Sequence, residues 1–67
     1  MKIGELANAT ATKVETVRFY ERIGLLAPPA RTSANYRSYG SSHLARLSFI
    51  RRARGLGFAL DAVRELL

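Results

Sequence analysis

The segment Val14–Arg22, which reads Val-Glu-Thr-Val-Arg-Phe-Tyr-Glu-Arg, constrains the fold more than any other part of the sequence. At about 100° per residue, Glu15, Arg18 and Arg22 fall on one face of a helix, while Val17 and other apolar side chains fall elsewhere. A guanidinium has a rigid set of donors that suits a phosphate or the O6/N7 edge of guanine. The segment therefore predicts an amphipathic helix presented to a DNA groove. A charged face that is merely solvated is the alternative.

The composition favours a polyanionic partner. The chain has 67 residues, enough for one small domain, and its 11 Lys and Arg against 5 Asp and Glu give a net charge of +6. So basic a balance on so short a chain favours nucleic acid. The sequence has no cysteine, which is consistent with the reducing cytoplasm where we expect the protein to act. We expect no membrane span, because no apolar run reaches about 18 residues.

The residues before this segment predict a second, shorter helix. Ile3, Leu6 and Ala7 have the i, i+3, i+4 spacing of an apolar helix face. Thr12 and Glu15 match the capping box Thr-x-x-Glu and predict that the next helix is capped by Thr12. Two short helices joined by a tight turn predict a helix-turn-helix over about residues 3–22, whose second helix reads the major groove. A plain helical hairpin is the alternative reading.

The residues after the helix-turn-helix predict a small β-hairpin. Gly24 suits the end of the second helix, and Pro28-Pro29 excludes further helix. Two short β-prone arms then flank a turn at residues 33–35, where Asn35 is the residue best able to adopt positive φ. The sequence therefore predicts a basic, aromatic wing over about residues 30–39. We expect Tyr39, at its end, to pack into the core rather than to contact DNA.

Two more helices complete the prediction, over about residues 42–54 and 60–67. Ser42 is the expected N-cap of the first, and apolar residues fall into two stripes on it. The stripes are Leu44, Leu47 and Ile50, and Ala45, Phe49 and Ala53. Cations near the C-terminus of this helix complement its dipole, which is the favoured role for Arg51, Arg52 and Arg54, with DNA contact as the alternative. The last helix has no C-cap residue, and we interpret it as part of a longer protein.

The sequence does not predict an enzyme. His43 is the only histidine and is more typical of a surface residue than of a metal ligand, since no cysteine or second histidine accompanies it. No nucleophile–base set is present, and Gly55 and Gly57 lack the spacing of a phosphate-binding loop. We therefore expect no metal or cofactor within residues 1–67.

Four ordered blocks resemble the N-terminal domain of MerR-family transcription regulators, and they cover nearly the whole chain. The blocks are Ile-Gly-Glu-Leu-Ala at 3–7, Val-Glu-Thr-Val-Arg-Phe-Tyr-Glu-Arg-Ile-Gly-Leu-Leu at 14–26, Asn-Tyr-Arg-Ser-Tyr at 35–39, and Leu-Ser-Phe-Ile-Arg-Arg-Ala-Arg-Gly-Leu-Gly-Phe at 47–58. The resemblance is strongest to the heavy-metal-responsive branch. It implies a mostly α fold, a winged helix-turn-helix with four short helices and a two-stranded hairpin.

The resemblance also implies a mechanism. Such regulators form homodimers through a long helix, which would lie beyond residue 67, and bind a metal ion or small-molecule effector further along. The dimer binds a promoter palindrome and distorts the spacer so that RNA polymerase can engage both promoter elements. Two other functions stay open: a free-standing excisionase-like architectural DNA-binding protein, and a small RNA-associated protein.

Positions that match the family give the candidate DNA-binding residues. Arg18 would contact base and phosphate, Tyr20 would pack and reach phosphate, and the wing would contact phosphates. Many members have Gly where Ala11 stands and Ser or Thr where Ala59 stands, so the last helix is expected to lack a side-chain cap. The full candidate set is Glu15, Thr16, Arg18, Tyr20, Arg31, Tyr36 and Arg37.

Overall fold

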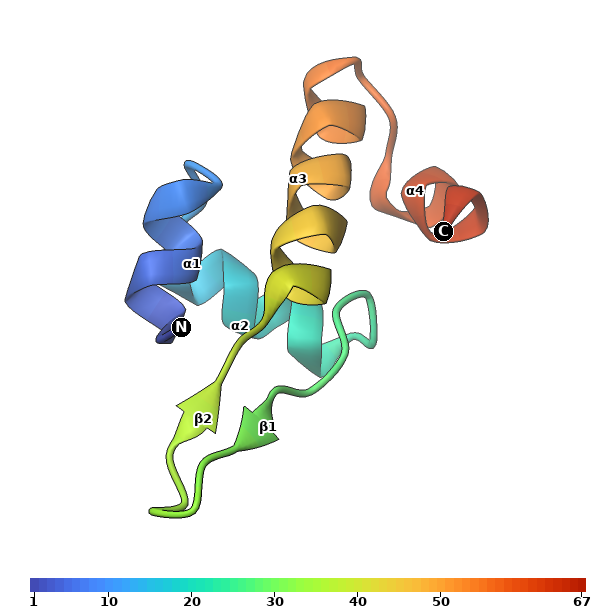
Figure 1. Cartoon of the computed structure of the whole chain (residues 1–67). Helices are drawn as coiled ribbons and strands as arrows, with labels where there is room; N and C mark the ends of the chain where they lie inside the picture. Colours follow the sequence, from blue (N-terminus) through green and yellow to red (C-terminus); the bar gives the residue numbers. More distant parts are fainter.

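The computed structural model describes all 67 residues, which form four helices and one two-stranded antiparallel hairpin (Figure 1). This confirms the mostly α winged helix-turn-helix predicted from the sequence. No helix is both long and apolar enough to cross a membrane. The elements are α1 (Ile3–Ala9), α2 (Val14–Arg22), β1 (Ala30–Arg31), β2 (Arg37–Ser38), α3 (Ser41–Gly55) and α4 (Leu60–Leu66).

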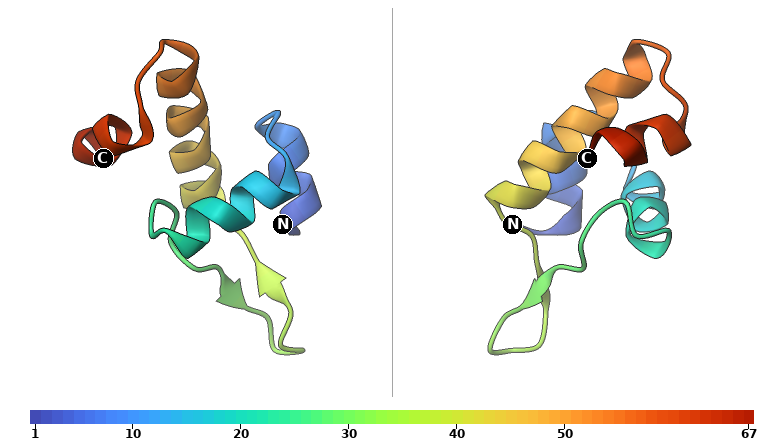
Figure 2. Two further views of the ribbon diagram at one scale, coloured as in Figure 1. Left: turned by 180° about the vertical axis from the view of Figure 1, so that it is seen from behind. Right: turned by 90° about the vertical axis from the view of Figure 1, so that its right-hand side faces the viewer.

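The long helix α3 is the centre of the molecule. The views in Figures 1 and 2 place α1 and α4 on opposite sides of α3, while the hairpin projects away from the helices at the end remote from the α3–α4 connection. The hairpin therefore has the position of a wing beside α2, as the sequence predicted.

The core consists of two adjoining clusters. Leu6, Val17 and Leu47 are at the centre of one, between α1, α2 and α3. Ile50 and Val63 are at the centre of the other, between α3 and α4. All five side chains are fully buried, so the apolar face predicted for α2 from Val17 is confirmed.

The apolar side of α3 differs in part from the prediction. The stripe containing Leu47 and Ile50 is buried as expected, but Ala45 is exposed and Phe49 is 41% exposed, so the second stripe is wrong at these two positions. Buried positions on α3 instead recur every third residue as far as Ala53. Each step of three residues turns about 60° around a helix, so a single row passes from the α1 side to the α4 side.

The turn between α1 and α2 corrects the predicted capping box. The N-cap of α2 is Lys13, not Thr12, and no side chain caps this helix. Thr12 instead closes the end of α1: its N–H donates to the Ala7 carbonyl at 2.9 Å and its hydroxyl donates to the Thr10 carbonyl at 3.1 Å. Ala11 makes this possible by adopting a left-handed conformation with φ of 50°.

We predict that Ala11→Gly stabilises the fold. An alanine in the left-handed region costs about 1–2 kcal/mol, while glycine adopts it freely at an entropic cost of roughly 0.5–1 kcal/mol. The free energy of unfolding should therefore rise by about 0.5–1 kcal/mol, which moves the melting temperature up by several degrees in a domain this small. The matched control is Ala9→Gly in the last position of α1. This change should lower the free energy of unfolding. A lower melting temperature for Ala11→Gly would contradict the assigned conformation.

The start of α3 also differs from the prediction. Its N-cap is Gly40 rather than Ser42, and Nδ1 of His43 accepts the Gly40 N–H at 3.1 Å. Gly57, with φ of 98°, follows the end of α3 as predicted for this glycine-rich turn. The N-cap of α4 is Ala59 and makes no side-chain bond, as expected from its methyl side chain.

The wing is a short hairpin with a defined register. Arg31 pairs with Arg37 and Ala30 with Ser38. Asn35 has φ of 65°, so the turn residue predicted to adopt positive φ is confirmed. The base of the wing is tied to the start of the chain, since the Tyr39 N–H donates to the Met1 carbonyl at 2.8 Å and the Met1 amino nitrogen donates to the Tyr39 carbonyl at 2.6 Å.

Candidate nucleic-acid interface

Arg18 lies exposed on α2, and its guanidinium has no hydrogen-bond partner in the structure. The helix turns Arg18 toward solvent because the adjacent Val17, about 100° away around α2, is fully buried. Arg22, one turn further along, places its guanidinium carbon 5.9 Å from the centre of the Phe19 ring, a cation–π contact. Because the Arg18 guanidinium has no partner within the fold, its N–H donors are free to bind a base edge or a phosphate.

A shallow hollow joins α2 to the wing. It is lined by Arg18, Glu21, Arg22, Pro28 and Arg37. Three guanidiniums and one carboxylate give the hollow a net positive charge. The proline ring is its one apolar side chain. Such a hollow suits a phosphodiester rather than an apolar small molecule.

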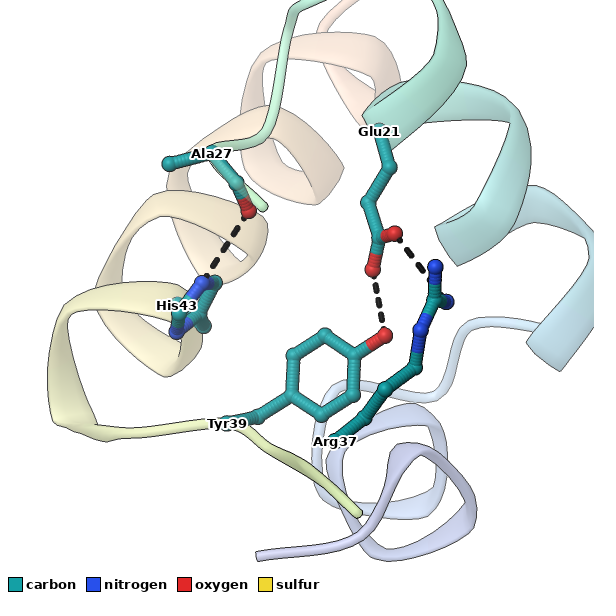
Figure 3. A network of polar contacts seen from close by, with 5 residues as sticks. All are labelled: Glu21, Ala27, Arg37, Tyr39 and His43. Carbon is teal, nitrogen blue, oxygen red and sulfur yellow. Dashed lines mark hydrogen bonds and ion pairs between the residues drawn. The ribbon is translucent and has the colours of Figure 1, made fainter. Parts of the chain in front are cut away.

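The carboxylate of Glu21 links α2 to the wing (Figure 3). Its Oε2 accepts a hydrogen bond from Nη1 of Arg37 at 3.3 Å, and its Oε1 accepts a hydrogen bond from the Tyr39 hydroxyl. The Glu21 side chain is only 10% exposed, against 45% for Arg37. Glu21 could not be predicted from the sequence, because its partners lie 16 and 18 residues away in the chain and no local pattern reveals them.

His43 joins the same region from the other side of Tyr39 (Figure 3). Its Nε2 lies 3.1 Å from the Ala27 carbonyl, and its ring meets the Tyr39 ring edge-on at 5.2 Å. With Nδ1 accepting the Gly40 N–H, Nε2 is the ring nitrogen that donates to the Ala27 carbonyl. His43 is thus a half-buried link between two loops, where the sequence had suggested a plain surface residue.

Tyr39 is fully packed, as predicted, with 2% of its surface exposed. Its pKa is raised, first because burial disfavours the phenolate, and then because the Glu21 carboxylate accepts its hydrogen bond and repels a second negative charge. The pKa of Tyr39 is higher in the folded state than in the unfolded chain. The protonated hydroxyl therefore makes its full contribution to the free energy of unfolding below a pH of about 10. This contribution is lost as the pH rises through the folded-state pKa.

We predict that Tyr39→Phe flattens the alkaline side of the stability profile. Between pH of about 9.5 and 11 the unfolded tyrosine ionises before the folded one, so the free energy of unfolding of the original chain should fall with pH. Phenylalanine cannot ionise, so the variant should lose less stability over this range. Urea unfolding at several pH values measures the two slopes. Tyr36→Phe, at a tyrosine that is 72% exposed, is the control and should keep the original slope; equal slopes for all three proteins would contradict the assignment.

The exposed wing carries three of the predicted residues. Tyr36 is 72% exposed, and Arg31 is exposed with one N–H donated to the Asn35 carbonyl at 3.3 Å. Arg31 lies directly across the ladder from Arg37, and like charges in that position repel each other. A phosphate between or beside them would relieve this repulsion. Arg37 differs from the prediction in one respect, since part of its donor set is already bound to Glu21.

The other predicted residues lie along α2, from its first turn to Tyr20. Glu15 is exposed in the first turn, and Thr16 and Tyr20 line a second hollow together with Lys13. Tyr20 packs against both core clusters, so its predicted packing role is confirmed. The structure therefore brings Arg18 and Arg37 to one hollow and Thr16 and Tyr20 to another.

The arginines at the end of α3 bind backbone carbonyls. Arg51 donates to the Ala11 carbonyl at 3.4 Å, and Arg54 donates to the Phe58 carbonyl at 2.8 Å. Both also line the hollow at the start of α2. These bonds favour a structural role over DNA contact for Arg51 and Arg54. No cluster of three His, Asp or Glu side chains gathers to hold a metal ion.

Comparison with known proteins agrees with this architecture. The family model described as "MerR HTH family regulatory protein" matches residues 1–67. The chain is 52% identical over all 67 residues to the HTH-type transcriptional regulator ZntR homolog of Haemophilus influenzae, of which it covers 50%. It is 45% identical over 67 residues to the HTH-type transcriptional regulator CueR of Yersinia pestis, of which it covers 48%.

Solved structures agree as well. The transcription regulator PbrR691 from Ralstonia metallidurans CH34, solved in complex with lead(II), superposes with a TM-score of 0.88 at 52% identity, over 98% of this chain and 52% of that one. A MerR-family regulator from Bacillus cereus superposes with a TM-score of 0.90 at 30% identity, over 98% of this chain and 49% of that one. The chain thus spans about half the length of these relatives.

A winged helix-turn-helix with an exposed arginine face on its second helix is typical of the DNA-binding domain of a transcription regulator. The match over the whole chain makes the assignment more specific: this chain belongs to the MerR family of helix-turn-helix regulatory proteins. Its relatives are transcription regulators, which are not enzymes.

Proposed function

We propose that α2 enters the major groove of double-stranded DNA while the wing contacts the phosphates beside it. Arg18 would read a base edge or hold a phosphate, with Glu15 and Thr16 near the same groove. The wing would contact phosphates through Arg31, Tyr36 and Arg37. Tyr20 of α2 would add one more phosphate contact. The observation that carries this proposal is that Arg18 and Arg37 line one hollow although 19 positions separate them in the chain.

The proposal extends to the whole protein by way of its relatives. A dimer formed by a helix beyond residue 67 would bind a palindrome in a promoter spacer, and distortion of that spacer would control access by RNA polymerase. Because its partners would be promoter DNA and RNA polymerase, the protein would act in the cytoplasm. It would act by binding and not by catalysing a reaction. The relatives reported above favour regulation over the excisionase-like alternative.

We further propose that a metal ion is the effector. One relative is described as "Heavy metal-dependent transcription regulator 2", and another was solved with lead(II). Residues 1–67 contain no cysteine and no acidic or histidine cluster that could bind such an ion. The effector site would therefore lie beyond residue 67.

A salt titration tests DNA binding directly. Fluorescence anisotropy with a labelled duplex of about 20 base pairs should show binding that weakens as salt rises. Arg18, Arg31 and Arg37 would each neutralise one phosphate, so log K against log salt should have a slope near −3, at about −0.9 per contact. A chain that binds no duplex at low salt, or binds one without salt dependence, would rule the interface out.

A further inference from the structure

Glu21 is the one acidic residue in the hollow between α2 and the wing. Arg18, Arg22 and Arg37 surround it there. On a surface that meets a polyanion, a carboxylate repels phosphates and lowers affinity. Its presence among three arginines is therefore unfavourable for DNA binding as such, unless it acts on the arrangement of its neighbours.

The contacts of Glu21 show which neighbours it arranges. One oxygen accepts from Arg37 and the other from Tyr39, so a single residue of α2 holds both ends of the segment in which the wing rejoins the helices (Figure 3). The Glu21 side chain is almost buried, while Arg37 remains 45% exposed. One donor of the guanidinium is fixed on Glu21 and the others remain free for a second acceptor.

The wing has little internal structure that could fix its direction. Each of its strands has only two residues, and an isolated hairpin is marginally stable in water. Arg31 in β1 and Tyr36 beside the turn are both exposed. The direction of the wing relative to α2 therefore depends on the contacts at its base, where Tyr39 packs into the core cluster that includes Val17 and the Glu21 carboxylate supplies the side-chain hydrogen bonds from α2.

We propose that Glu21 is a positioning residue that determines DNA specificity. Resting on the DNA binding proposed above, the inference is that Glu21 fixes Arg37 and the wing against α2, so that helix and wing meet DNA in one geometry. A duplex whose groove and phosphates fit that geometry gains both contacts, and other duplexes gain fewer. The negative charge of Glu21 also disfavours phosphates that approach the hollow in any other position.

Glu21→Gln tests the proposal, because glutamine keeps a hydrogen-bond acceptor for Tyr39 but loses the charge that holds Arg37. The probes are the duplex that the original chain enriches from a random-sequence pool and a scrambled duplex of equal length and composition. We expect an unchanged circular dichroism spectrum and a ratio of the two affinities that falls about tenfold. Glu65→Gln, at an exposed residue of α4 with no side-chain bond, removes the same charge and should leave the ratio within about twofold.

A double-mutant cycle separates positioning from a general charge effect. If Glu21 acts through Arg37, then Glu21→Gln should change the affinity ratio by less than about twofold when Arg37→Gln is already present. A full tenfold change in that background would show that Glu21 does not act through Arg37 and would overturn the proposal. So would a ratio for Glu21→Gln that equals the ratio for Glu65→Gln.

Different results would contradict DNA recognition and the positioning role of Glu21. If the original chain enriches no duplex, DNA recognition itself is wrong. Relaxation of the Arg37 Nε–H by nitrogen-15 NMR then still decides the positioning, without DNA. We expect a restrained guanidinium in the original chain and in Glu65→Gln, and a mobile one in Glu21→Gln; equal mobility in all three would overturn the positioning role.

Discussion

Arg18→Ala should weaken binding to the preferred duplex by about 5- to 150-fold, which corresponds to the roughly 1–3 kcal/mol of a base-edge contact. Stability should change little, because the Arg18 side chain is exposed and makes no bond within the fold. Binding to a scrambled duplex should fall less, since only one of the three phosphate-neutralising arginines is lost. Anisotropy titrations on both duplexes, together with thermal unfolding, measure the three quantities.

Arg18→Lys is the matched control, because it keeps the charge and removes the bidentate donor geometry. We expect it to keep the salt slope of the original chain and to lose discrimination between the two duplexes. Arg18→Ala should lose discrimination and also reduce the slope by about 1. If Arg18→Ala binds the preferred duplex within twofold of the original chain, Arg18 is not a recognition residue.

The exposed face of α2 could be predicted from the sequence, because the regular period of a helix assigns each residue to a face without any information from distant parts of the chain. Val17 and Arg18 are neighbours in the chain, and the helical repeat alone places one in the core and the other in solvent. Asn35 was predictable for the same kind of reason, since few residues other than glycine adopt positive φ at low cost.

The cap of α2 was not predictable, because two local signals competed. Thr12 with Glu15 matches a capping box, yet the chain reverses at Ala11 in a conformation that alanine disfavours. That reversal directs the Thr12 N–H back to Ala7 and leaves Lys13 as the N-cap. α1 and α2 pack against each other in one core cluster, and this packing offsets the cost of the strained turn at Ala11. The turn therefore forms in place of the Thr12 capping box.

The hollow between α2 and the wing was predictable only in part. The basic residues on each element could be found separately, but the sequence does not show that Arg37 binds Glu21 before any phosphate arrives. That pairing depends on how Tyr39 packs, because its buried ring brings the end of the wing next to α2. Long-range packing therefore decides which arginine donors are free, and this is the information a periodic pattern lacks.

Linking two copies of the chain should have the largest effect of all on DNA binding. Dimeric helix-turn-helix proteins read two half-sites roughly 34 Å apart, and a connection must hold that spacing. Within residues 1–67 the buried side chain of Val63 on α4 is used to close the domain's own core rather than a partner's. We therefore expect the chain to be mainly monomeric in sedimentation, and to bind a palindromic duplex no more tightly per site than a single half-site.

Two copies joined by a flexible Gly/Ser linker should bind the palindrome about 10²- to 10⁴-fold more tightly than the single chain, through effective concentration alone. A linker of about 40 residues has an average span near the required spacing, at roughly 5–6 Å multiplied by the square root of its length. The gain should vanish on a duplex with one half-site scrambled, since the second copy then has no site to occupy. A single chain that sediments as a stable dimer and binds the palindrome at nanomolar strength in physiological salt would place the dimer interface within these 67 residues, and the linked form would then gain nothing.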